Sequence, residues 1–414
     1  DSPPQSPKKG TNMDIDLEKL VAELGDDGRD AGLSVVADLE PLGGPGATVK
    51  PAVYAGGLYQ QDVRWPEGNN GVVPDAPVKV LVVDNVPSEA NRQETALRQL
   101  QGRLGLPVLV LDLGAAGELP PHLPPQLTSF DWPHRHADAY LRDSVLRSTG
   151  EPFDRSEIGL ALMAATQTRP NALLEWMPQS LVYGFWQSHK GKKRTQAKFA
   201  RAVEVEILGW QPATVETKQL GLKGDPLNLS VESALGYDPN DLDGWEVLDT
   251  KRGGSKKAQE SLAEIGHGQV PVSENDAAPA GVSFRRIEQR GTISFARLRN
   301  IVAETPEQSA AARTLLACLG LVGIEAAFGS GFTLRSGADL VPASRSWSWR
   351  GTGTTDAVDA LNLDGALRLW DEAVAHAESV GLPVGSKWAS APLMLDPNPQ
   401  LTQVIRESYA VEES

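Results

Sequence analysis

Two hydrophobic periods alternate along the first part of the chain. Residues 33–42 (LSVVADLEPL) alternate apolar and polar side chains with the period of two that is typical of a strand. Residues 78–83 (VKVLVV) form the continuous apolar run of a buried strand. Residues 88–104 repeat their apolar positions at helical spacing, and we expect Ser88 to cap this helix. With a further strand expected at 106–113, strands and helices are interleaved from the start.

The same patterns continue to the end of the chain. Helical spacing or helix signals occur at residues 13–24, 132–146, 157–166, 171–176, 306–319 and 359–380. Strand-like alternation returns at 281–301, and a Gly-rich turn follows at 328–332. The apolar runs 181–186 and 202–208 flank a basic loop like the arms of a hairpin, or like a strand and a helix. The interleaved elements predict an α+β fold.

The domain organisation follows from where these patterns fade. Residues 1–12 (DSPPQSPKKGTN) are polar and precede Met13, so we interpret them as an artificial remnant before the native start. Residues 13–414 are expected to form a single domain. Within it, residues 209–268 lose their periodicity to Gly, Asp and Lys and predict an irregular insertion, and 359–381 predicts a C-terminal helical segment.

Composition narrows the class of protein. Hydrophobic residues make up 40% of the chain and charged residues 22%, which is typical of a globular protein. The single cysteine, Cys318, excludes an intrachain disulfide framework and a multi-cysteine zinc site, and it fits a reducing cytoplasm. The most apolar stretch, 314–324, is shorter than the roughly 20 residues that cross a bilayer. We therefore expect a soluble, cytoplasmic protein with no membrane partner.

Charge is distributed unevenly. The formal net charge of −15 argues against a nucleic-acid binder. However, residues 189–201 hold six Lys/Arg and no acid, 251–257 hold four more, and 281–299 hold five Arg against one Glu. Such polarity is typical of a protein that holds a polyanion on one side, although solvated loops would show the same composition.

One short string invites a metal interpretation. His134, His136 and Asp138 lie in DWPHRHAD with H-x-H-x-D spacing, and imidazoles and a carboxylate are common ligands of one ion. The dinuclear hydrolase form of this motif has a further His where this chain has Ala139. A helix would also point residues i and i+2 to different faces. We favour polar residues at an interface and keep a metal-dependent nuclease or hydrolase as the alternative.

The basic segment 190–201 has a different chemistry. Lys and Arg neutralise phosphates without reading bases, and aromatic side chains stack on the bases of single strands. Phe185, Trp186 and Phe199 lie beside this segment. Phosphate contacts explain the basic segment best, and the aromatic residues beside it are typical of a single-strand binding surface. For Trp186 or Phe199 taken singly, however, a plain core role is the favoured interpretation. No phosphate loop or nucleophile elbow accompanies the segment.

Five strings carry a family resemblance. They are 82–94 (VVDNVPSEANRQE), 128–144 (TSFDWPHRHADAYLRDS), 179–209 (QSLVYGFWQSHKGKKRTQAKFARAVEVEILG), 261–271 (SLAEIGHGQVP) and 329–336 (GSGFTLRS). In these strings the chain resembles the Cas-seven-type (Csb-one) backbone subunit of type I-U, also called I-G, CRISPR effector (Cascade) complexes, a branch of the RAMP superfamily. The strings occur in the same order as in that family and cover the chain from about Leu33 to Val341.

The resemblance implies a fold and a role. The fold would be a modified RNA-recognition-motif (ferredoxin-like) palm with large thumb and finger insertions. Several copies would bind one CRISPR guide RNA, kink it periodically with a projecting loop, and present it for pairing with target DNA. The other partners would be the large subunit, a fused Cas-five/Cas-six-type subunit and a recruited helicase-nuclease. The subunit would be non-catalytic and would need no cofactor or metal, although RNA cleavage stays open because related type III subunits cut RNA.

The expected RNA-binding residues come from these strings and from the basic windows. They are Lys190, Lys192, Lys193, Arg194, Lys198, Arg201, Arg92, His134, Arg135, Arg285, Arg286, Ser330, Lys256 and Lys257. Salt bridges between neighbouring copies would explain Arg92, His134 and Arg135 equally well. A generic single-stranded RNA-binding protein outside CRISPR is the remaining alternative.

Overall fold

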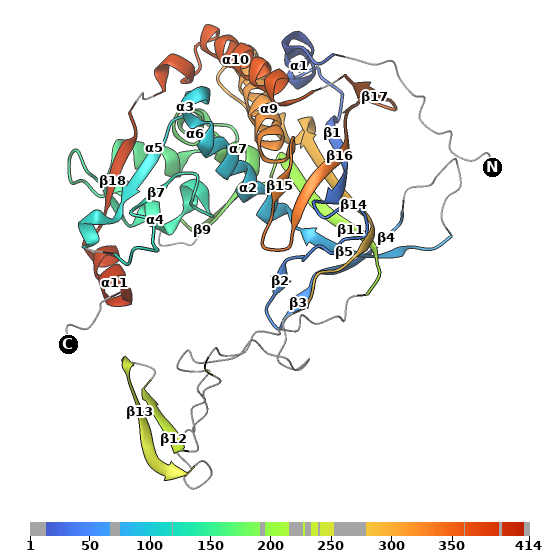
Figure 1. Ribbon diagram of the computed structural model, residues 1–414. Helices are drawn as coiled ribbons and strands as arrows, with labels where there is room; N and C mark the ends of the chain where they lie inside the picture. The colour runs from blue at the N-terminus through green and yellow to red at the C-terminus, as the bar shows by residue number, and fades with distance from the viewer. Residues whose placement is uncertain are drawn as a thin grey trace.

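The computed structural model describes most of the chain. The described residues are 14–66, 75–117, 119–190, 195–214, 227, 233–238, 241–251, 279–359, 361–388 and 391–409. Helices and strands alternate through this part of the chain, and they build two mainly antiparallel sheets covered by helices (Figure 1). The α+β fold class expected from the sequence is confirmed.

The larger sheet has the strand order β15-β16-β1-β14-β11-β5-β4, with β17 added beside β16. Its strands are β1 (Gly32–Pro41), β4 (Gln61–Arg64), β5 (Val78–Asp84), β11 (Val203–Pro212), β14 (Phe284–Ser294), β15 (Phe332–Thr333), β16 (Asp339–Arg350) and β17 (Thr355–Val358). All of these pairings are antiparallel. The four central strands, β16-β1-β14-β11, form the core of the sheet.

Two helices join these four strands in a recognisable order. Helix α2 (Val86–Gln99) lies in sequence between β1 and β11, and α9 (Pro306–Phe328) lies between β14 and β16. The chain therefore runs strand, helix, two strands, helix, strand, with the first strand between the fourth and the third in the sheet. This is the topology of a ferredoxin-like palm, with β4 and β5 added at one edge.

One face of the sheet is packed against helices. Leu33, Val35 and Ala37 of β1 alternate inward with Val203 and Val205 of β11. Helices α2 and α9 cover this face, and α1 (Leu17–Leu24) and α10 (Leu363–Ser379) lie beyond α9 (Figure 1). The apolar faces of all four helices share one core with the sheet.

Helix α9 explains the most apolar stretch of the sequence. Within the described residues it is the one helix that is long and apolar enough to cross a membrane, and 89% of its apolar window is buried inside the protein. Cys318 is fully buried in this helix, where burial raises the pKa of its thiol. The composition of α9 is therefore that of a central core helix.

A second, smaller sheet lies beside the palm. Its order is β7 (Gln126–Thr128), β6 (Leu109–Asp112), β18 (Leu393–Pro397) and β8 (Ser144–Leu146), and β18 runs parallel to β6. The helices grouped with this sheet in the chain are α3 (Gln101–Leu104), α4 (Ala139–Arg142), α5 (Glu157–Ala164), α6 (Asn171–Trp176), α7 (Gln179–Tyr183) and α11 (Pro399–Tyr409). Short 3-10 turns lie at Leu113–Ala116, Arg135–Ala137, Phe153–Arg155 and Gly385–Lys387. The side-chain packing of this region is continuous with the palm core.

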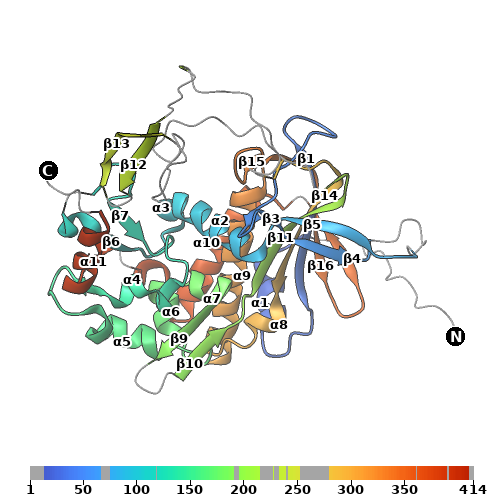
Figure 2. The same ribbon diagram turned by 90° about the horizontal axis from the view of Figure 1, so that it is seen from below.

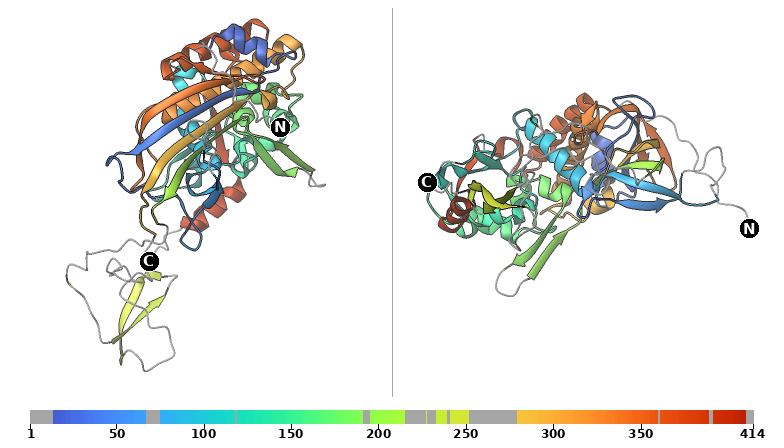
Figure 3. Two further views of the ribbon diagram at one scale, coloured as in Figure 1. Left: turned by 90° about the vertical axis from the view of Figure 1, so that its right-hand side faces the viewer. Right: turned by 60° about the horizontal axis from the view of Figure 1, so that its bottom comes forward.

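Three hairpins complete the described structure, together with the short helix α8 (Phe295–Leu298). The hairpins are β2 (Val53–Tyr54) with β3 (Leu58–Tyr59), β9 (Phe185–Lys190) with β10 (Thr195–Phe199), and β12 (Ser233–Asp238) with β13 (Asp241–Lys251). Figures 2 and 3 show the β9–β10 hairpin projecting from the body of the protein. The β12–β13 hairpin belongs to the predicted insertion and pairs only with itself.

Several predictions about single elements are wrong. Asn85, not Ser88, caps α2: its side chain accepts a hydrogen bond from the Ser88 backbone N–H at 3.1 Å. The helix expected at 132–146 is instead a 3-10 turn, the four-residue α4 and strand β8. This segment cannot continue as one helix because Arg135 adopts a positive φ of 55° and Asp138 starts a new helix at Ala139.

Other boundaries shift in ways that the core explains. The irregular insertion does not begin at 209, because β11 continues to Pro212 within the palm sheet. Helix α9 runs to Phe328 rather than 319, and α10 occupies the C-terminal helical segment. Strands β16, β17 and β18 and helix α11 were not expected. The remnant at 1–12 lies outside the described residues.

Candidate nucleic-acid interface

Successive side chains of the β9–β10 hairpin alternate between a buried face and an exposed face. Phe185 pairs with Phe199, and both are buried with their rings stacked at 5.6 Å. The next pair, Trp186 and Lys198, points the other way; Trp186 is 56% exposed and Lys198 is exposed. The core interpretation is therefore right for Phe199 and wrong for Trp186. One face of the hairpin attaches it to the protein, and the other offers an aromatic ring beside a cation.

A buried ion pair supports the hairpin from beneath. The Arg135 guanidinium donates to both carboxylate oxygens of Glu94 at 2.8 and 2.7 Å, and both side chains are almost fully buried. Arg135 also donates to the carbonyl oxygen of Gly184, the residue before β9, at 2.9 Å. Burial raises the pKa of Glu94, while the charge and hydrogen bonds of Arg135 oppose that rise. Arg135 thus ties α2 to the start of the hairpin.

Gly184 is required at this junction. Its φ is 73°, and a Cβ there would lie 2.6 Å from the Phe199 carbonyl oxygen and 2.9 Å from the Arg201 nitrogen. A side chain would collide with backbone that cannot move without opening the hairpin. The glycine therefore lets the two strands meet at their base.

Arg201 is a cation without a complete set of partners. It lies between β10 and β11, and its Nε is buried without a hydrogen-bond acceptor among the described residues. Burial lowers the pKa of Arg201, and the charges of Arg135 and Arg297 lower it further, against Glu204 and Glu94. Arg297 meanwhile pairs with Glu204 at 2.6 Å. A guanidinium in this position would be stabilised by an anion such as a phosphate.

The segment that connects β9 to β10 in sequence is the most basic stretch of the chain. Lys190 is the last residue of β9. Lys192, Lys193 and Arg194 follow it and lie outside the described residues, as do Lys256 and Lys257 of the insertion. In sequence, residues 192–194 lie between β9 and β10.

A cleft of about 430 Å³ opens beside the exposed face of the hairpin. Trp186 forms one wall, and the turn at 134–142 and the segment 153–163 form the others. The lining includes apolar Phe153, Leu162 and Met163 together with polar His134, Arg142 and Asp154. The sequence did not predict the apolar part of this lining, for which the helical pattern at 157–166 gave no specific signal.

The H-x-H-x-D residues occupy one side of this cleft without converging. His134 is exposed, whereas His136 is buried edge-on against Phe185 at 4.1 Å between ring centroids. Asp138 caps α4 and accepts hydrogen bonds from the backbone N–H groups of Tyr140 at 3.0 Å and His134 at 3.1 Å. Across the described ranges, no group of three or more His, Cys, Asp or Glu is placed to hold a metal ion.

Comparison with known proteins finds a family model that matches this region. Residues 33–213 match the family model described as CRISPR-associated protein GSU0053. The match covers somewhat less than half of the chain, and it is a similarity to a CRISPR-associated protein family. No curated protein matches the chain.

The matched part of the chain contains the whole described part of the candidate interface. It begins at β1 and ends at β11, so it includes α2, the turn at 134–142 and the β9–β10 hairpin. The strands β14 and β16 and the helix α9, which complete the palm, follow after it.

The remaining sequence-predicted residues lie elsewhere. Arg92 pairs with Asp84 at 2.8 Å and donates to the Leu334 carbonyl oxygen, so it ties α2 to the palm. Ser330 is exposed in the turn after α9, and Arg285 is exposed on β14. Arg286, also on β14, has carboxylate partners on the palm sheet. The structure therefore does not bring these four residues together with the hairpin.

The face of the palm sheet that points away from α2 and α9 carries a row of paired charges beside a small apolar cluster that includes Leu208 and Trp210. We call it the outer face and define it by Asp38, Glu206, Arg286, Glu288 and Arg290. Arg286 pairs with Asp38 at 2.5 Å and with Glu288 at 2.7 Å, and Arg290 pairs with the same Glu288. Arg64 of β4 pairs with Glu206 at 2.5 Å. These arginines are neutralised within the protein.

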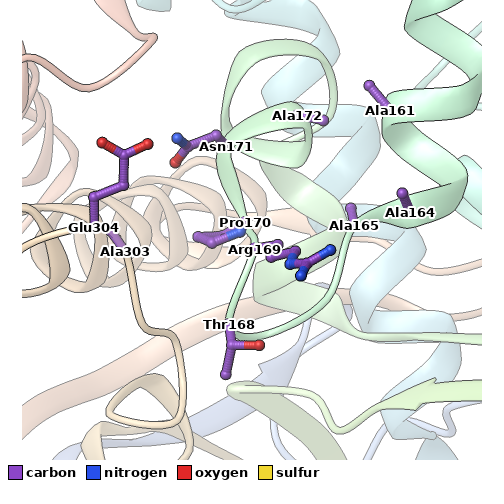
Figure 4. Close-up of a pocket in the computed structure, with 10 residues that line it drawn as sticks. All are labelled: Ala161, Ala164, Ala165, Thr168, Arg169, Pro170, Asn171, Ala172, Ala303 and Glu304. Atoms are coloured by element: carbon purple, nitrogen blue, oxygen red, sulfur yellow. The ribbon is translucent and has the colours of Figure 1, made fainter.

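A second cleft, of about 300 Å³, lies between the α5–α6 region and the segment before α9 (Figure 4). Alanine side chains line much of it, and Arg169, Asn171 and Glu304 are its polar residues. It has no aromatic wall, and its charged groups are of both signs. This chemistry favours no particular ligand.

Proposed function

We propose that this CRISPR-associated chain is a non-catalytic backbone subunit that binds guide RNA in several copies. It would present the RNA for pairing with target DNA in a type I-U/I-G (Cascade) complex of the RAMP class, in the cytoplasm. Its partners would be further copies of itself, the large subunit, a fused Cas-five/Cas-six-type subunit and a recruited helicase-nuclease. The observation that carries the proposal is the projecting β9–β10 hairpin, with exposed Trp186 beside Lys198 within the family-matched segment.

The arrangement suits single-stranded RNA for a physical reason. Cations on a projecting element neutralise successive phosphates and release counterions, which supplies affinity without sequence readout. An aromatic ring beside them stacks on a base of any identity. A guide-binding subunit needs this indifference to sequence, because every spacer differs. Arg92, Arg135 and Arg286 have carboxylate partners, and we leave them out of the proposed interface.

One feature of the palm, the outer face of its sheet, supports a scaffold rather than a standard RNA-recognition domain. Such a domain stacks bases on aromatic residues of its open sheet face. Here the corresponding outer face carries paired arginines and carboxylates, and its tryptophan, Trp210, is buried. In the proposed function, the RNA is therefore bound by the hairpin beside the sheet, and not by the sheet face that a standard RNA-recognition domain uses.

The test is co-expression of the chain with a CRISPR repeat-spacer array and the partner subunits, followed by gel filtration and sequencing of bound RNA. Large particles with guide-derived RNA at a fixed number of copies are the expected result. RNA of random origin at variable stoichiometry would favour a generic single-strand binder. Turnover of RNA by the purified particle that depends on an added metal would contradict the non-catalytic role.

A further inference from the structure

The cleft beside the β9–β10 hairpin is the most specific unassigned feature of the described surface. Trp is among the side chains that proteins bury on average, yet Trp186 leaves 56% of its area exposed at a cleft edge. A cleft of about 430 Å³ falls within the range of roughly 300–1,000 Å³ that is usual for small-molecule sites. It has room for one flat ring system against the indole.

The lining combines the apolar and the hydrogen-bonding groups that binding a nucleobase requires. Phe153, Leu162 and Met163 supply an apolar interior. His134 and Asp154 stand at the same cleft with a ring nitrogen and a carboxylate that can meet the hydrogen-bonding edge of a base. Lys198 lies directly across the hairpin from Trp186, so a phosphate attached to a bound base would meet a cation.

We propose that this cleft holds one unstacked nucleobase of the bound RNA, with Trp186 as its stacking platform and Lys198 near its phosphate. The inference rests on the proposed function and adds the subsite that each copy would use. A protein side chain from a neighbouring copy is the competing occupant. The exposed Lys198 beside Trp186 favours the nucleotide, because an apolar side chain would gain nothing from this cation.

The experiment combines one protein change with a walk along the RNA. Guide RNAs with a single abasic nucleotide at successive positions are bound to wild-type protein and to Trp186→Ala. The free energy of stacking one base on an aromatic side chain predicts that Trp186→Ala lowers the affinity for RNA by roughly 5- to 100-fold. At the RNA position whose base occupies the cleft, the abasic change and Trp186→Ala remove the same contact. The two changes together should therefore lower the affinity no more than either change alone.

Two further variants control for folding and for aromatic exposure. Trp186→Phe keeps a ring and should retain most of the affinity. Trp65, at the end of β4, is 60% exposed, so Trp65→Ala removes an indole of similar exposure away from the hairpin and should leave affinity unchanged. Unchanged thermal unfolding midpoints show that all three variants fold.

The outcomes separate the subsite from the function. If RNA binds, Trp186→Ala stays within twofold of wild type and abasic effects remain additive at every position, the nucleobase subsite is wrong while the RNA-binding role stands. If Trp186→Ala changes the number of copies per RNA but no abasic position responds, the cleft is a contact between copies. If the wild-type protein binds no guide RNA, both proposals are wrong.

Discussion

The outer face of the palm sheet and the β9–β10 hairpin are both rich in cations, but their cations have different partners. On the outer face, Arg286 and Arg290 share Glu288, whose side chain is fully buried. On the hairpin, Lys198 is exposed and the Nε of Arg201 is buried without an acceptor among the described residues. The number of basic residues does not distinguish the two regions. The ion pairs distinguish them, because they show which region has cations available to bind a polyanion.

The first and largest test asks what holds the hairpin in place. Arg135→Ala should lower the free energy of unfolding by about 3–5 kcal/mol, because it leaves the buried Glu94 carboxylate uncompensated. Arg64→Ala, which removes a partner of Glu206 on the outer face, should cost only about 0–1 kcal/mol, since the pairs of Arg64 with Asp62 and Glu206 are partly exposed and screened by water. Urea unfolding of both variants measures the difference. Equal losses would mean that the buried pair has no special role beneath the hairpin.

The second test compares the two regions as RNA surfaces. Replacing Lys192, Lys193 and Arg194 by Ala should weaken RNA binding about tenfold or more at moderate salt. The slope of log affinity against log salt should fall by about 0.7 for each phosphate that the variant no longer neutralises. The matched control replaces Arg64, Arg285 and Arg286 by Ala, which removes the same formal charge from strands β4 and β14 and leaves Arg290 paired with the buried Glu288. An unchanged slope for the hairpin variant, or an equal change for the control, would remove the hairpin from the interface.

The third and smallest test concerns the opposite face of the same sheet. Glu89 of α2 is fully buried, and its carboxylate accepts a hydrogen bond from Gln289 of β14 at 3.3 Å. Burial, followed by the hydrogen bond and charge of Asp84, raises the pKa of Glu89 well above its ordinary value. The folded state therefore binds a proton that the unfolded state releases above about pH 4.3.

The sign of the resulting pH dependence is fixed. Because the folded state holds more protons, this group makes stability fall as pH rises from about 4.3 toward the raised pKa, by at most about 1.4 kcal/mol per pH unit. Glu89→Gln has no proton to lose and should show a shallower decline between about pH 5 and 8. Urea midpoints at several pH values compare the two proteins, and RNA affinity should not change. Parallel curves would show that Glu89 is ionised in the folded state.

The sequence predicted those elements whose hydrophobic period is set by one core. Strands β1 and β5 and helices α2, α5, α6 and α10 lie where alternation or helical spacing placed them. Strand β16 was not predicted, because only Trp347 and Trp349 at its end alternate with polar residues. Pro342 and several serines give the rest of the strand no apolar alternation. The segment 132–146 misled because Trp132, Leu141 and Leu146 reach the core through turns that share no helical face.

The candidate site could be predicted only in part. Its basic character was evident from the segment 190–201, and the family strings included it. The exposure of Trp186 was not evident, because it depends on the register that pairs Phe185 with Phe199 and turns the next residue outward. The partners of Arg92, Arg135 and Arg286 were hidden as well, since Asp84, Glu94 and Asp38 reach them only through the folded chain.

The parallel pairing of β18 with β6 also governs how the protein emerges from the ribosome. Strand β18 lies between β6 and β8 in the smaller sheet, yet it is synthesised long after both of them. During translation, the edges of β6 (Leu109–Asp112) and β8 (Ser144–Leu146) that pair with β18 stay unpaired while most of the palm is synthesised. Such edges are templates for wrong pairing. Synthesis of β18 is thus the event that seals the lobe beside the hairpin, and a chain terminated before it would be prone to aggregate.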